Sequence, residues 1–512
     1  MPQPNGNLYT LLASHFPADG SKVAIQTPEK NYSYDDIDAL SAQYANALAS
    51  LNLPAGSRIA VQVEKSPEAL MLYLASLRAG LVYLPLNTAY RDAEVEYFVT
   101  DAEPAVLVCD PTRETGMHAL AQKTGGARVF TLDSQGAGSL TDAAQAQDPT
   151  FDTHASQADD LAAILYTSGT TGRSKGAMLS HGNLSSNALV LHDYWGWSDQ
   201  DVLLHMLPIF HVHGLFVASH AALLAGASMI WLPKLDIAQA LHYLPQSTVM
   251  MGVPTYYVRL LDDPGFTRDV CRNMRLFISG SAPLLSDTFS AFEARTGHRI
   301  LERYGMSETI MLTSNPYHQA DGQRIAGTVG PALPGVDLRI TNDKDEPLGT
   351  GEIGDVQVRG PNVFSGYWRM PEKTREEFTG DGWFRTGDMG SLGGNGLSDN
   401  VVTIVGRNKD LIISGGYNVY PKEIELVLDE QPGVLESAVI GVPHPDFGEA
   451  VVAVVVPLEG AQPDTEQLRE TLRTDLANFK VPKEIRLISA LPRNTMGKVQ
   501  KNVLRQDWSA GS

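Results

Sequence analysis

Hydrophobic residues in the first part of the chain follow two alternating patterns. Residues 34–51 carry an apolar side chain every three or four positions, which predicts an amphipathic helix, and Ser33 is placed to cap its first turn. A second helical pattern covers residues 68–79. Short apolar runs at residues 58–63 and 105–109 predict buried strands. Strands that alternate with helices indicate an α/β fold with a largely parallel sheet.

Two later regions depart from this alternation of helices and strands. Residues 133–160 are rich in Ala, Gln, Asp, Gly and Ser, and we expect a surface connection there without a helix or strand. Near the end, Pro421 opens a helical pattern and residues 450–456 form a β-branched run that predicts a strand. A further amphipathic helix is marked by Leu468, Leu472, Leu476 and Phe479. The C-terminal part is therefore predicted to be a compact α+β domain of its own.

Size and composition limit the class of protein. A chain of 512 residues is too long for one ordinary core, so we expect two or more domains. Hydrophobic residues make up 43% and charged residues 19%, as in globular proteins. The net charge of −20 argues against nucleic acid or an anionic membrane as the main partner, because both attract a basic surface.

Cysteine usage and targeting patterns predict where the protein works. Cys109 and Cys271 stand in apolar contexts, which predicts buried thiols rather than a disulfide framework. The N-terminal residues lack a signal-peptide pattern, and no apolar run reaches transmembrane length. We expect a cytoplasmic enzyme.

One stretch carries the strongest chemical signal. Residues 166–176, YTSGTTGRSKG, follow an apolar run that predicts a buried strand. The glycines let the backbone approach a ligand, hydroxyls and N–H groups can wrap an anion, and Lys175 and Arg173 add charge. A polyphosphate fits this combination. A solvated polar loop is the ordinary alternative. A Walker A loop does not fit, since that motif requires Gly directly before Lys and Ser174 stands there.

The complete string resembles the phosphate loop of the ANL superfamily, which contains acyl-CoA synthetases, adenylation domains and firefly-type luciferases. Further matching segments recur along most of the chain: ERYGMSE at 302–308, TGD at 386–388, GRNKD at 406–410, SGGYN at 414–418 and PRNTMGK at 492–498. Three departures are visible. Ser174 replaces the usual Pro, Ser307 replaces Thr, and residues 391–396 replace an acidic, aromatic hairpin, which leaves the conformation there open.

The resemblance implies a large N-terminal adenylate-forming domain, residues 1–408, and a small mobile C-terminal lid domain, residues 409–512, with the hinge at Lys409. It implies that Tyr304 stacks on adenine, that Asp388 binds the ribose hydroxyls and that Glu308 and Thr167 help to hold Mg²⁺ on ATP. The full set of implied ATP-binding residues is Thr167, Ser168, Gly169, Thr170, Thr171, Lys175, Gly280, Ser281, Ala282, Glu302, Arg303, Tyr304, Gly305, Ser307, Asp388, Arg407 and Lys498.

The resemblance also implies the reaction. Lys498 would bridge a substrate carboxylate and the α-phosphate of ATP, so Lys498 and Glu308 are the expected catalytic residues. CoA would then attack the acyl-adenylate, with its pantetheine arm passing Gly415 and Gly416, after the C-terminal domain rotates. No nucleophilic triad is needed, because positioning and charge neutralisation suffice. In related enzymes the same lysine is acetylated, which implies an acetyltransferase as a protein partner.

The acid is suggested by two arginines. Arg259, on a helix that begins at Pro254, and Arg303 fall at pocket positions that most acetate or fatty-acid enzymes fill with neutral residues. Two fixed cations suit a second carboxylate that stays unreacted. The arrangement resembles malonyl-CoA synthetases, and we expect malonate, with methylmalonate as a slower substrate. The residues expected around the acid are Arg259, Arg303, His211, Ser279 and Met306.

Other readings remain at this stage. Arg259 could be an ordinary exposed arginine, His211 a core histidine and Lys498 an idle surface lysine. The chain could also be a CoA ligase for another short acid, or a stand-alone adenylation enzyme, although no carrier-protein pattern follows Lys498 in this sequence. A non-catalytic nucleotide-binding protein would be expected to lack parts of the site. Lys175, Glu308, Asp388, Arg407 and Lys498 are all present.

Overall fold

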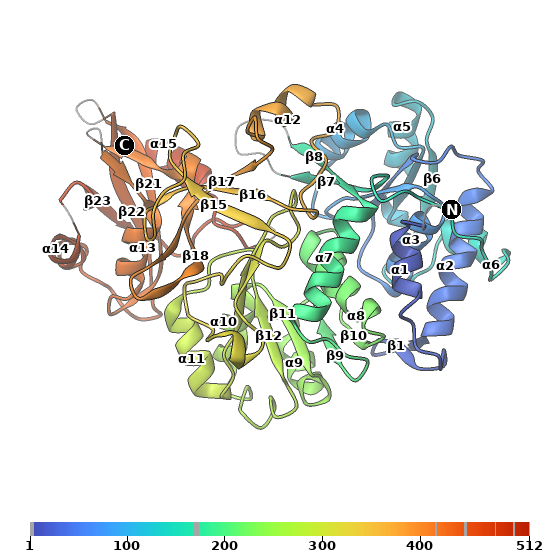
Figure 1. Cartoon of the computed structure of the whole chain (residues 1–512), viewed down its shortest axis with the longest axis horizontal. Helices are drawn as coiled ribbons and strands as arrows, with labels where there is room; N and C mark the ends of the chain where they lie inside the picture. Colours follow the sequence, from blue (N-terminus) through green and yellow to red (C-terminus); the bar gives the residue numbers. More distant parts are fainter. Residues whose placement is uncertain are drawn as a thin grey trace.

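The structure is a computed structural model that describes residues 5–167, 174–414, 417–444, 448–476, 478–494 and 497–510. These residues form four sheets, and the C-terminal part lies at the opposite end of the molecule from the N-terminus (Figure 1). The six-stranded sheet has the order β6-β5-β3-β4-β7-β8, in which β8 alone runs antiparallel to its neighbour. Its strands are β3 (Arg58–Gln62), β4 (Val82–Pro85), β5 (Val106–Cys109), β6 (Arg128–Thr131), β7 (Leu161–Thr167) and β8 (Lys175–Ser180).

The eight-stranded sheet has the order β14-β13-β12-β11-β9-β10-β1-β2 and is parallel except for its two edge strands, β14 and β2. Its strands are β1 (Val23–Gln26), β2 (Asn31–Ser33), β9 (Val202–His205), β10 (Ser228–Trp231), β11 (Val249–Gly252), β12 (Leu276–Ser279), β13 (Leu301–Tyr304) and β14 (Thr313–Ser314). One hydrophobic cluster joins the two large sheets, with Ile59 of β3 and Leu203 of β9 among its buried members. The two sheets therefore share one core.

Helices alternate with these strands, as the hydrophobic pattern predicted. They are α1 (Leu8–Ala13), α2 (Tyr34–Ala49), α3 (Pro67–Arg78), α4 (Asp92–Ala102), α5 (Glu114–Lys123), α6 (Ser139–Gln145), α7 (His181–Tyr194), α8 (His220–Leu224), α9 (Ile237–Tyr243), α10 (Pro254–Asp262) and α11 (Ser286–Thr296). A π-helix, η2 (His213–Ser219), leads directly into α8. Short 3₁₀ turns are η1 (Pro111–Arg113), η3 (Leu244–Gln246) and η4 (Gln319–Asp321).

A four-stranded antiparallel sheet, β15-β16-β17-β18, follows the two large sheets and carries the last part of the N-terminal domain. It consists of β15 (Asp337–Thr341), β16 (Gly354–Arg359), β17 (Phe384–Gly394) and β18 (Leu397–Arg407), with α12 (Pro371–Glu377) between β16 and β17. Residues 391–396, whose conformation the sequence left open, belong to a β17–β18 hairpin. Asn395 and Gly396 form its turn with φ of 51° and 81°, the combination that favours Asn-Gly.

The C-terminal part begins after the 3₁₀ turn η5 (Asn408–Asp410) and folds around its own sheet, β20-β19-β22-β21, with β23 beside β22. The elements are β19 (Ile412–Ser414), β20 (Tyr417–Val419), α13 (Pro421–Asp429), β21 (Val434–His444), β22 (Gly448–Pro457), α14 (Thr465–Asp475), β23 (Glu484–Leu487) and α15 (Lys501–Ala510). Two hydrophobic clusters contain only residues of this part. The prediction of a separate α+β unit is confirmed.

Several predicted elements are confirmed and two are wrong. Ser33 caps α2 through a capping box with Asp36, and the thiols of Cys109 and Cys271 are free and buried. Residues 133–160, expected to lack an element, contain the short helix α6, which packs against α2. Its apolar residues are too few to show a clear helical period. The contact with α2, rather than the local sequence pattern, therefore determines that these residues are helical. The helix α14 ends at Asp475, because Leu476 is already extended, so Leu476 and Phe479 pack on the core from outside the helix.

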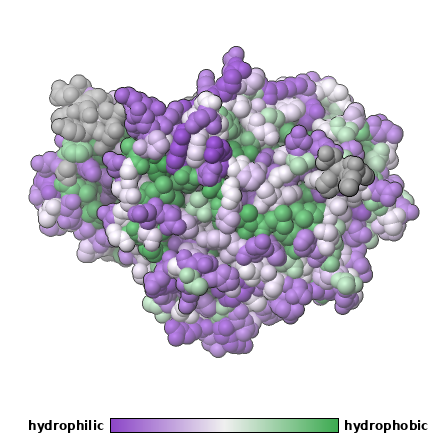
Figure 2. Space-filling model, in the orientation of Figure 1, coloured by the Kyte–Doolittle hydropathy of each residue, from purple (hydrophilic) through white to green (hydrophobic). Residues whose placement is uncertain are grey.

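The surface agrees with a globular fold. Hydrophilic residues dominate the rim of the face in Figure 2, and hydrophobic residues gather toward its middle. Among the described residues no helix has the length and apolar character needed to cross a membrane.

Candidate functional site

The first part of the site gathers on the strands β13, β17 and β18. The Tyr304 hydroxyl donates to Oδ2 of Asp388 over 2.5 Å, and Arg407 Nε lies 3.1 Å from Oδ1 of the same carboxylate. Asp388 and Arg407 are register partners in the β17–β18 hairpin. Burial and Asp388 raise the pKa of Tyr304, and Asp388 raises the pKa of Arg407. The structure thus brings together three residues that the sequence placed in the nucleotide site.

A second carboxylate lies in the same region. Glu308 is buried and accepts a hydrogen bond of 3.0 Å from the Tyr367 hydroxyl, and burial raises its pKa. Lys175 Nζ lies 3.3 Å from Oε1 of Glu377 and 4.3 Å from the centroid of the Tyr367 ring. We call these charged and aromatic groups, each with a partner inside the protein, the paired cluster: Tyr304, Asp388, Arg407, Glu308, Tyr367, Lys175 and Glu377.

The predicted phosphate loop is held at both ends. Thr167 closes β7 and Lys175 opens β8, and the two residues are register partners in the antiparallel pair. The Thr167 hydroxyl also donates to the carbonyl oxygen of Lys175 over 3.4 Å. The loop residues Ser168, Gly169, Thr170 and Thr171 lie outside the described residues, as do Gly415 and Gly416, which were predicted to contact CoA.

The turn after β12 is shaped by close approaches of the backbone. A side chain at Gly280 would place its Cβ 2.4 Å from Cζ of Arg303, and one at Gly305 would lie 2.0 Å from the carbonyl oxygen of Ile310. Ser281 adopts a φ of 71°, and Ala282 follows it. A larger residue at position 305 would collide with the backbone of Ile310 and Met311, and one at position 280 would displace the guanidinium of Arg303. This turn is where a flat base was expected.

A different electrostatic environment surrounds Arg303. The residue is 4% exposed, and within the described part of the chain its Nε and Nη2 have no hydrogen-bond partner. Burial lowers the pKa of the guanidinium to about 9. Among the described residues Nε2 of His213 and Oγ of Ser279 are likewise buried without partners. His211, whose Nδ1 accepts from the His213 N–H, completes the group. We call the four residues the unpaired cluster because three of them hold a buried polar atom without a partner among the described residues: His211, His213, Ser279 and Arg303.

Charged groups of both clusters influence Lys498. Burial lowers its pKa, Arg407 and Arg303 lower it further, and Asp388 and Glu308 act in the opposite direction. Burial, followed by Lys498 and Arg303, lowers the pKa of His211 to about 3. The loop that carries Lys498 is docked on the N-terminal domain, since a Cβ at Gly497 would lie 3.7 Å from Oγ1 of Thr255. The docked C-terminal part therefore holds Lys498 where the charges of both clusters act on it.

Other predicted residues take different positions. Arg259 is exposed on the last turn of α10, whereas Arg303 is buried. Met306 and Ser307 are half-buried in the turn after β13. Lys409 belongs to η5, where burial and Arg407 lower its pKa to about 8, next to the ion pair of 2.8 Å between Arg505 and Asp410.

Some residues of the site escaped the sequence analysis. His213 stands two positions after His211 in the same segment, and Arg303 contributes to lowering its pKa. Tyr367, before α12, contacts Glu308, and Glu377, the last residue of α12, contacts Lys175. Both come to the site only through tertiary packing. The His-x-His spacing at 211–213 could have pointed to His213 as a site residue. No sequence motif pointed to Tyr367 or Glu377.

Glu302 is a buried carboxyl on β13. Burial raises its pKa to about 8, and its Oε1 accepts a hydrogen bond of 3.1 Å from the Gly327 N–H. Lys422 of the C-terminal part is the cation that acts on it.

The residues fit a magnesium ion that is shared with a nucleotide. Among the described residues no group of three His, Cys, Asp or Glu side chains could hold a metal ion by itself. Mg²⁺ usually needs only one or two carboxylates when substrate phosphates supply further oxygens. Glu308 offers one buried carboxylate, and the Thr167 hydroxyl stands at the start of the phosphate loop.

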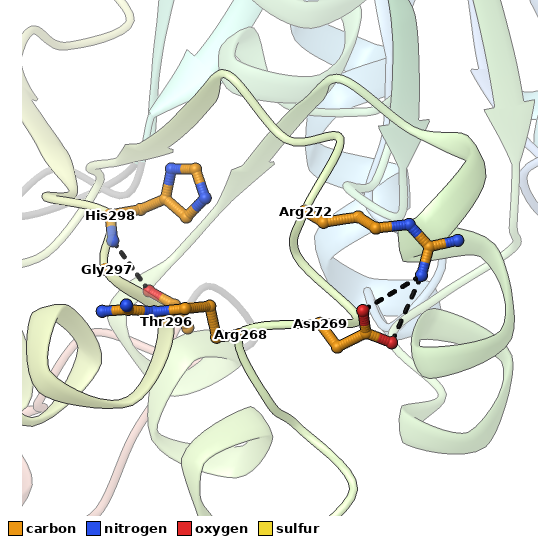
Figure 3. Close-up of a pocket in the computed structure, with 6 residues that line it drawn as sticks. All are labelled: Arg268, Asp269, Arg272, Thr296, Gly297 and His298. Atoms are coloured by element: carbon orange, nitrogen blue, oxygen red, sulfur yellow. Dashed lines mark hydrogen bonds and ion pairs between the residues drawn. The ribbon is translucent and has the colours of Figure 1, made fainter.

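One open depression elsewhere on the surface does not belong to this site. It is lined by Arg268, Asp269, Arg272, Thr296, Gly297 and His298 (Figure 3). Arg272 already pairs with Asp269 over 3.2 Å, and both residues are exposed. None of the predicted site residues lines it.

Comparison with known proteins finds AMP-binding enzymes and CoA ligases among the relatives of this chain. The family described as "AMP-binding enzyme" matches residues 14–368, and "AMP-binding enzyme C-terminal domain" matches residues 423–498. Malonate–CoA ligase from Arabidopsis thaliana is 34% identical over 535 aligned residues, covering 95% of this chain and 86% of that protein. Indoleacetate–CoA ligase from Aromatoleum aromaticum is also 34% identical, covering 96% of each chain.

Among solved structures, ATP-bound MatB from Rhodopseudomonas palustris is 56% identical to this chain, with a TM-score of 0.95, covering 98% of this chain and 99% of that one. The apo structure of the same MatB, at the same identity and coverage, gives a TM-score of 0.86. The present arrangement therefore resembles the ATP-bound form more closely, in agreement with a docked Lys498. The chain belongs to the AMP-binding enzyme family, the ANL superfamily of adenylate-forming enzymes.

Proposed function

We propose that this AMP-forming acid–CoA ligase uses malonate as its acid, with methylmalonate as a slower substrate. The observation that carries the proposal is the unpaired cluster. Arg303 is buried, and two of its nitrogens have no partner in the described structure. A buried guanidinium without an anion is unfavourable, and a dicarboxylate would supply the missing anion. A monocarboxylate would use its single carboxylate in the reaction and leave Arg303 unpaired.

The site residues divide the substrate between them. The reacting carboxylate would lie beside Lys498, and the second carboxylate would accept hydrogen bonds from Arg303 and Ser279. His211, whose pKa is lowered to about 3, stays neutral at pH 7 and can donate only one ring N–H. A bidentate contact between a guanidinium and a carboxylate is both strong and directional. This arrangement would leave one end of malonate fixed and present the other end to ATP.

The first half-reaction needs orientation and charge neutralisation. A carboxylate oxygen attacks the α-phosphorus of ATP, the bond to pyrophosphate breaks, and malonyl-AMP forms. Lys498 would hold the attacking oxygen and the α-phosphate together, while Lys175 would face the β and γ groups. Asp388 would hold the ribose hydroxyls, and Tyr304 would stack on adenine. Glu308 and Thr167 would hold Mg²⁺, which when bound would neutralise charge on the phosphates.

The second half-reaction forms the thioester. The CoA thiol attacks the malonyl carbonyl carbon, its proton is lost, and AMP leaves with the bonding electron pair. We propose that the C-terminal domain, residues 409–512, turns about Lys409 between the two steps, withdraws Lys498 and presents Gly415 and Gly416 to the pantetheine arm. The better match to ATP-bound MatB than to its apo form supports the view that the present arrangement belongs to the first step.

The test is release of pyrophosphate from ATP and magnesium with a panel of acids, with and without CoA. The panel contains malonate, methylmalonate, succinate, acetate, butyrate, benzoate, indoleacetate and several amino acids. We expect the highest kcat/KM with malonate and thioester formation only with CoA. Preference for a monocarboxylate would overturn the malonate assignment, and indoleacetate is included because one relative of equal identity carries that name. If the protein adenylates the acid but forms no thioester when CoA is added, it is a stand-alone adenylation enzyme.

We further propose that Lys498 is a target of a protein acetyltransferase and that the enzyme works in the cytoplasm. Acetylation would remove the charge that the first step needs. Lys498 is half-buried in the present arrangement, so ATP and acid should protect it from acetylation. Mass spectrometry after incubation with an acetyl donor and an acetyltransferase would find Lys498 modified in the free enzyme, and an unmodified Lys498 would contradict the proposal. The free thiols Cys109 and Cys271 agree with a reducing compartment, which cell fractionation would check.

A further inference from the structure

A buried lysine outside both clusters makes contacts that lead to the unpaired cluster. Lys65 follows β3 of the six-stranded sheet, is 7% exposed, and reaches across to the carboxyl ends of β9 and β10 in the eight-stranded sheet. Its Nζ lies 2.8 Å from the carbonyl oxygens of His205 and Leu232, and 2.9 Å from Nδ1 of His205. The ring of Trp231 lies 4.3 Å away. All three ammonium protons therefore have an acceptor, and no carboxylate is among them.

The contacts of both ring nitrogens assign the tautomer of His205. Burial lowers the pKa of Lys65 well below its usual range, so the assignment does not rest on its charge. The carbonyl oxygen of Gly214 beside Nε2 can only accept, so Nδ1 accepts from Lys65 and the ring proton lies on Nε2. That nitrogen is 3.0 Å from the carbonyl oxygen of Gly214 and 3.2 Å from Oγ of Ser219, which itself donates to the Gly214 oxygen over 2.9 Å. Burial, together with Lys65, lowers the pKa of His205 well below its usual range, so the ring stays neutral. Lys65, His205 and Gly214 form one directed chain of hydrogen bonds.

This chain of hydrogen bonds ends on the π-helix η2, whose first residue, His213, belongs to the unpaired cluster. Gly214 is the second residue of η2, and π-helical turns are rare. A Cβ at Gly214 would lie 2.1 Å from the Pro208 carbonyl oxygen, so the segment between them folds back tightly. His213 precedes Gly214 directly, its Nδ1 lies 3.4 Å from Oγ of Ser281, and Arg303 lowers its pKa. His211 stands three residues before Gly214, and its Nδ1 lies 3.4 Å from the N–H of His213.

We propose that Lys65 is a positioning residue for the acid: through His205 it holds the Gly214 carbonyl, and thereby the two histidines of the unpaired cluster. The inference rests on the proposed acid pocket, although it does not depend on which acid fills it. Lys65 touches neither substrate nor reacting atoms. Its loss should let the start of η2 shift, which would misplace His211 and His213 and leave the paired cluster in place.

The experiment compares Lys65→Met with Lys22→Met in the full chain. Lys22 is a matched control, because it also donates to two backbone carbonyls, those of Asp199 and Gly226. Pyrophosphate release is measured against acid and against ATP, using whichever acid the wild-type protein activates best. We expect Lys65→Met to raise the KM for the acid roughly tenfold and to change the KM for ATP less than twofold. Lys22→Met should lower only the Tm.

A second variant, His205→Phe, keeps a ring against Trp231, whose centroid lies 4.5 Å away, but removes the link to Gly214. It should raise the KM for the acid by a similar factor, and the double variant should be no worse than the more severe single one, because both break one chain. A Lys65→Met protein with a lowered Tm but an unchanged KM for the acid would overturn the proposal, as would additive effects. If Lys65→Met does not fold, an unchanged KM in His205→Phe overturns it instead. Activity on an acid other than malonate would overturn the proposed function alone.

Discussion

The paired and unpaired clusters meet at Lys498, yet they handle charge in opposite ways. In the paired cluster each described cation already has a carboxylate, with Arg407 on Asp388 and Lys175 on Glu377. In the unpaired cluster Arg303 is buried among His211, His213 and Ser279, and no ion pair joins it within the described residues. The two cations of the paired cluster have carboxylate partners before a ligand arrives, and Arg303 of the unpaired cluster has none among the described residues.

The difference shows how much each cluster depends on its ligand. Groups with internal partners hold their geometry in the free protein, and the ligand must compete for them. An unpartnered buried cation gains most from the ligand, because a negative charge removes the penalty of its burial. The paired cluster is thus suited to positioning, and the unpaired cluster is suited to selecting an acid by charge.

The largest effect is expected for Lys498→Ala, because Lys498 is influenced by both clusters. Adenylation, measured as pyrophosphate release, should fall roughly 10²- to 10³-fold, since loss of one positioned cation has about this effect on a charged transition state. Thioester formation from malonyl-AMP supplied directly should change less than threefold. Equal losses in both half-reactions would show that Lys498 has a general structural role instead.

The next effect tests the unpaired cluster through two arginines. Arg303→Met should lower kcat/KM for malonate roughly 30- to 1,000-fold, or about 2–4 kcal/mol, because a bidentate contact to a buried carboxylate is lost. The KM for ATP should stay within about threefold. Arg259 is the second arginine predicted to contact the acid, although it is exposed on α10. A change in kcat/KM of less than about threefold in Arg259→Met would show that Arg303 acts without it. If both variants lose activity equally, Arg259 also contacts the acid, as the sequence predicted.

A smaller effect is expected in the paired cluster. Asp388→Asn keeps the shape of the side chain but removes the charge that Tyr304 and Arg407 share. The KM for ATP should rise roughly tenfold, in line with about 1–2 kcal/mol for a charged hydrogen bond, and the KM for the acid should not change. A rise in the KM for the acid alone would contradict the division into two clusters.

The smallest effect is one of stability against pH. The pKa of Glu302 is about 8 in the folded protein, and without burial it is 4.5. At a pH between these two values, folding therefore takes up a proton. The stability that this group contributes is present below pH 4.5 and is lost as the pH rises through 8. Glu302→Gln cannot lose a proton, so its Tm relative to wild type should increase by roughly 3–5 °C from pH 5 to pH 9.

The control for this measurement is Glu459→Gln, since Glu459 is exposed. Its Tm difference from wild type should not change with pH. A pH-independent difference for Glu302→Gln as well would mean that Glu302 stays charged in the free protein, with Lys422 as the cation that acts on it.

The sequence predicted elements where the local signal was strong. The Ser33 cap, the proline starts of α10 and α13 and the apolar strand β7 are all local features, and each is confirmed. The prediction failed where packing overrides the pattern. The helix α6 is held against α2, and Leu476 leaves α14 while still covering the core.

The sequence by itself indicated the family through the resemblance of its motifs, the separate C-terminal unit through its hydrophobic pattern, and the charged side chains that the site could use. Only the tertiary structure decided which charges have partners. Arg259 and Arg303 are equivalent in the sequence, yet α10 leaves the first exposed while β13 buries the second. Lys65 and His205 are 140 residues apart, and only the packing of two sheets brings them together. Charge is carried by the residue, but its effective strength depends on burial and neighbours, which are properties of the fold.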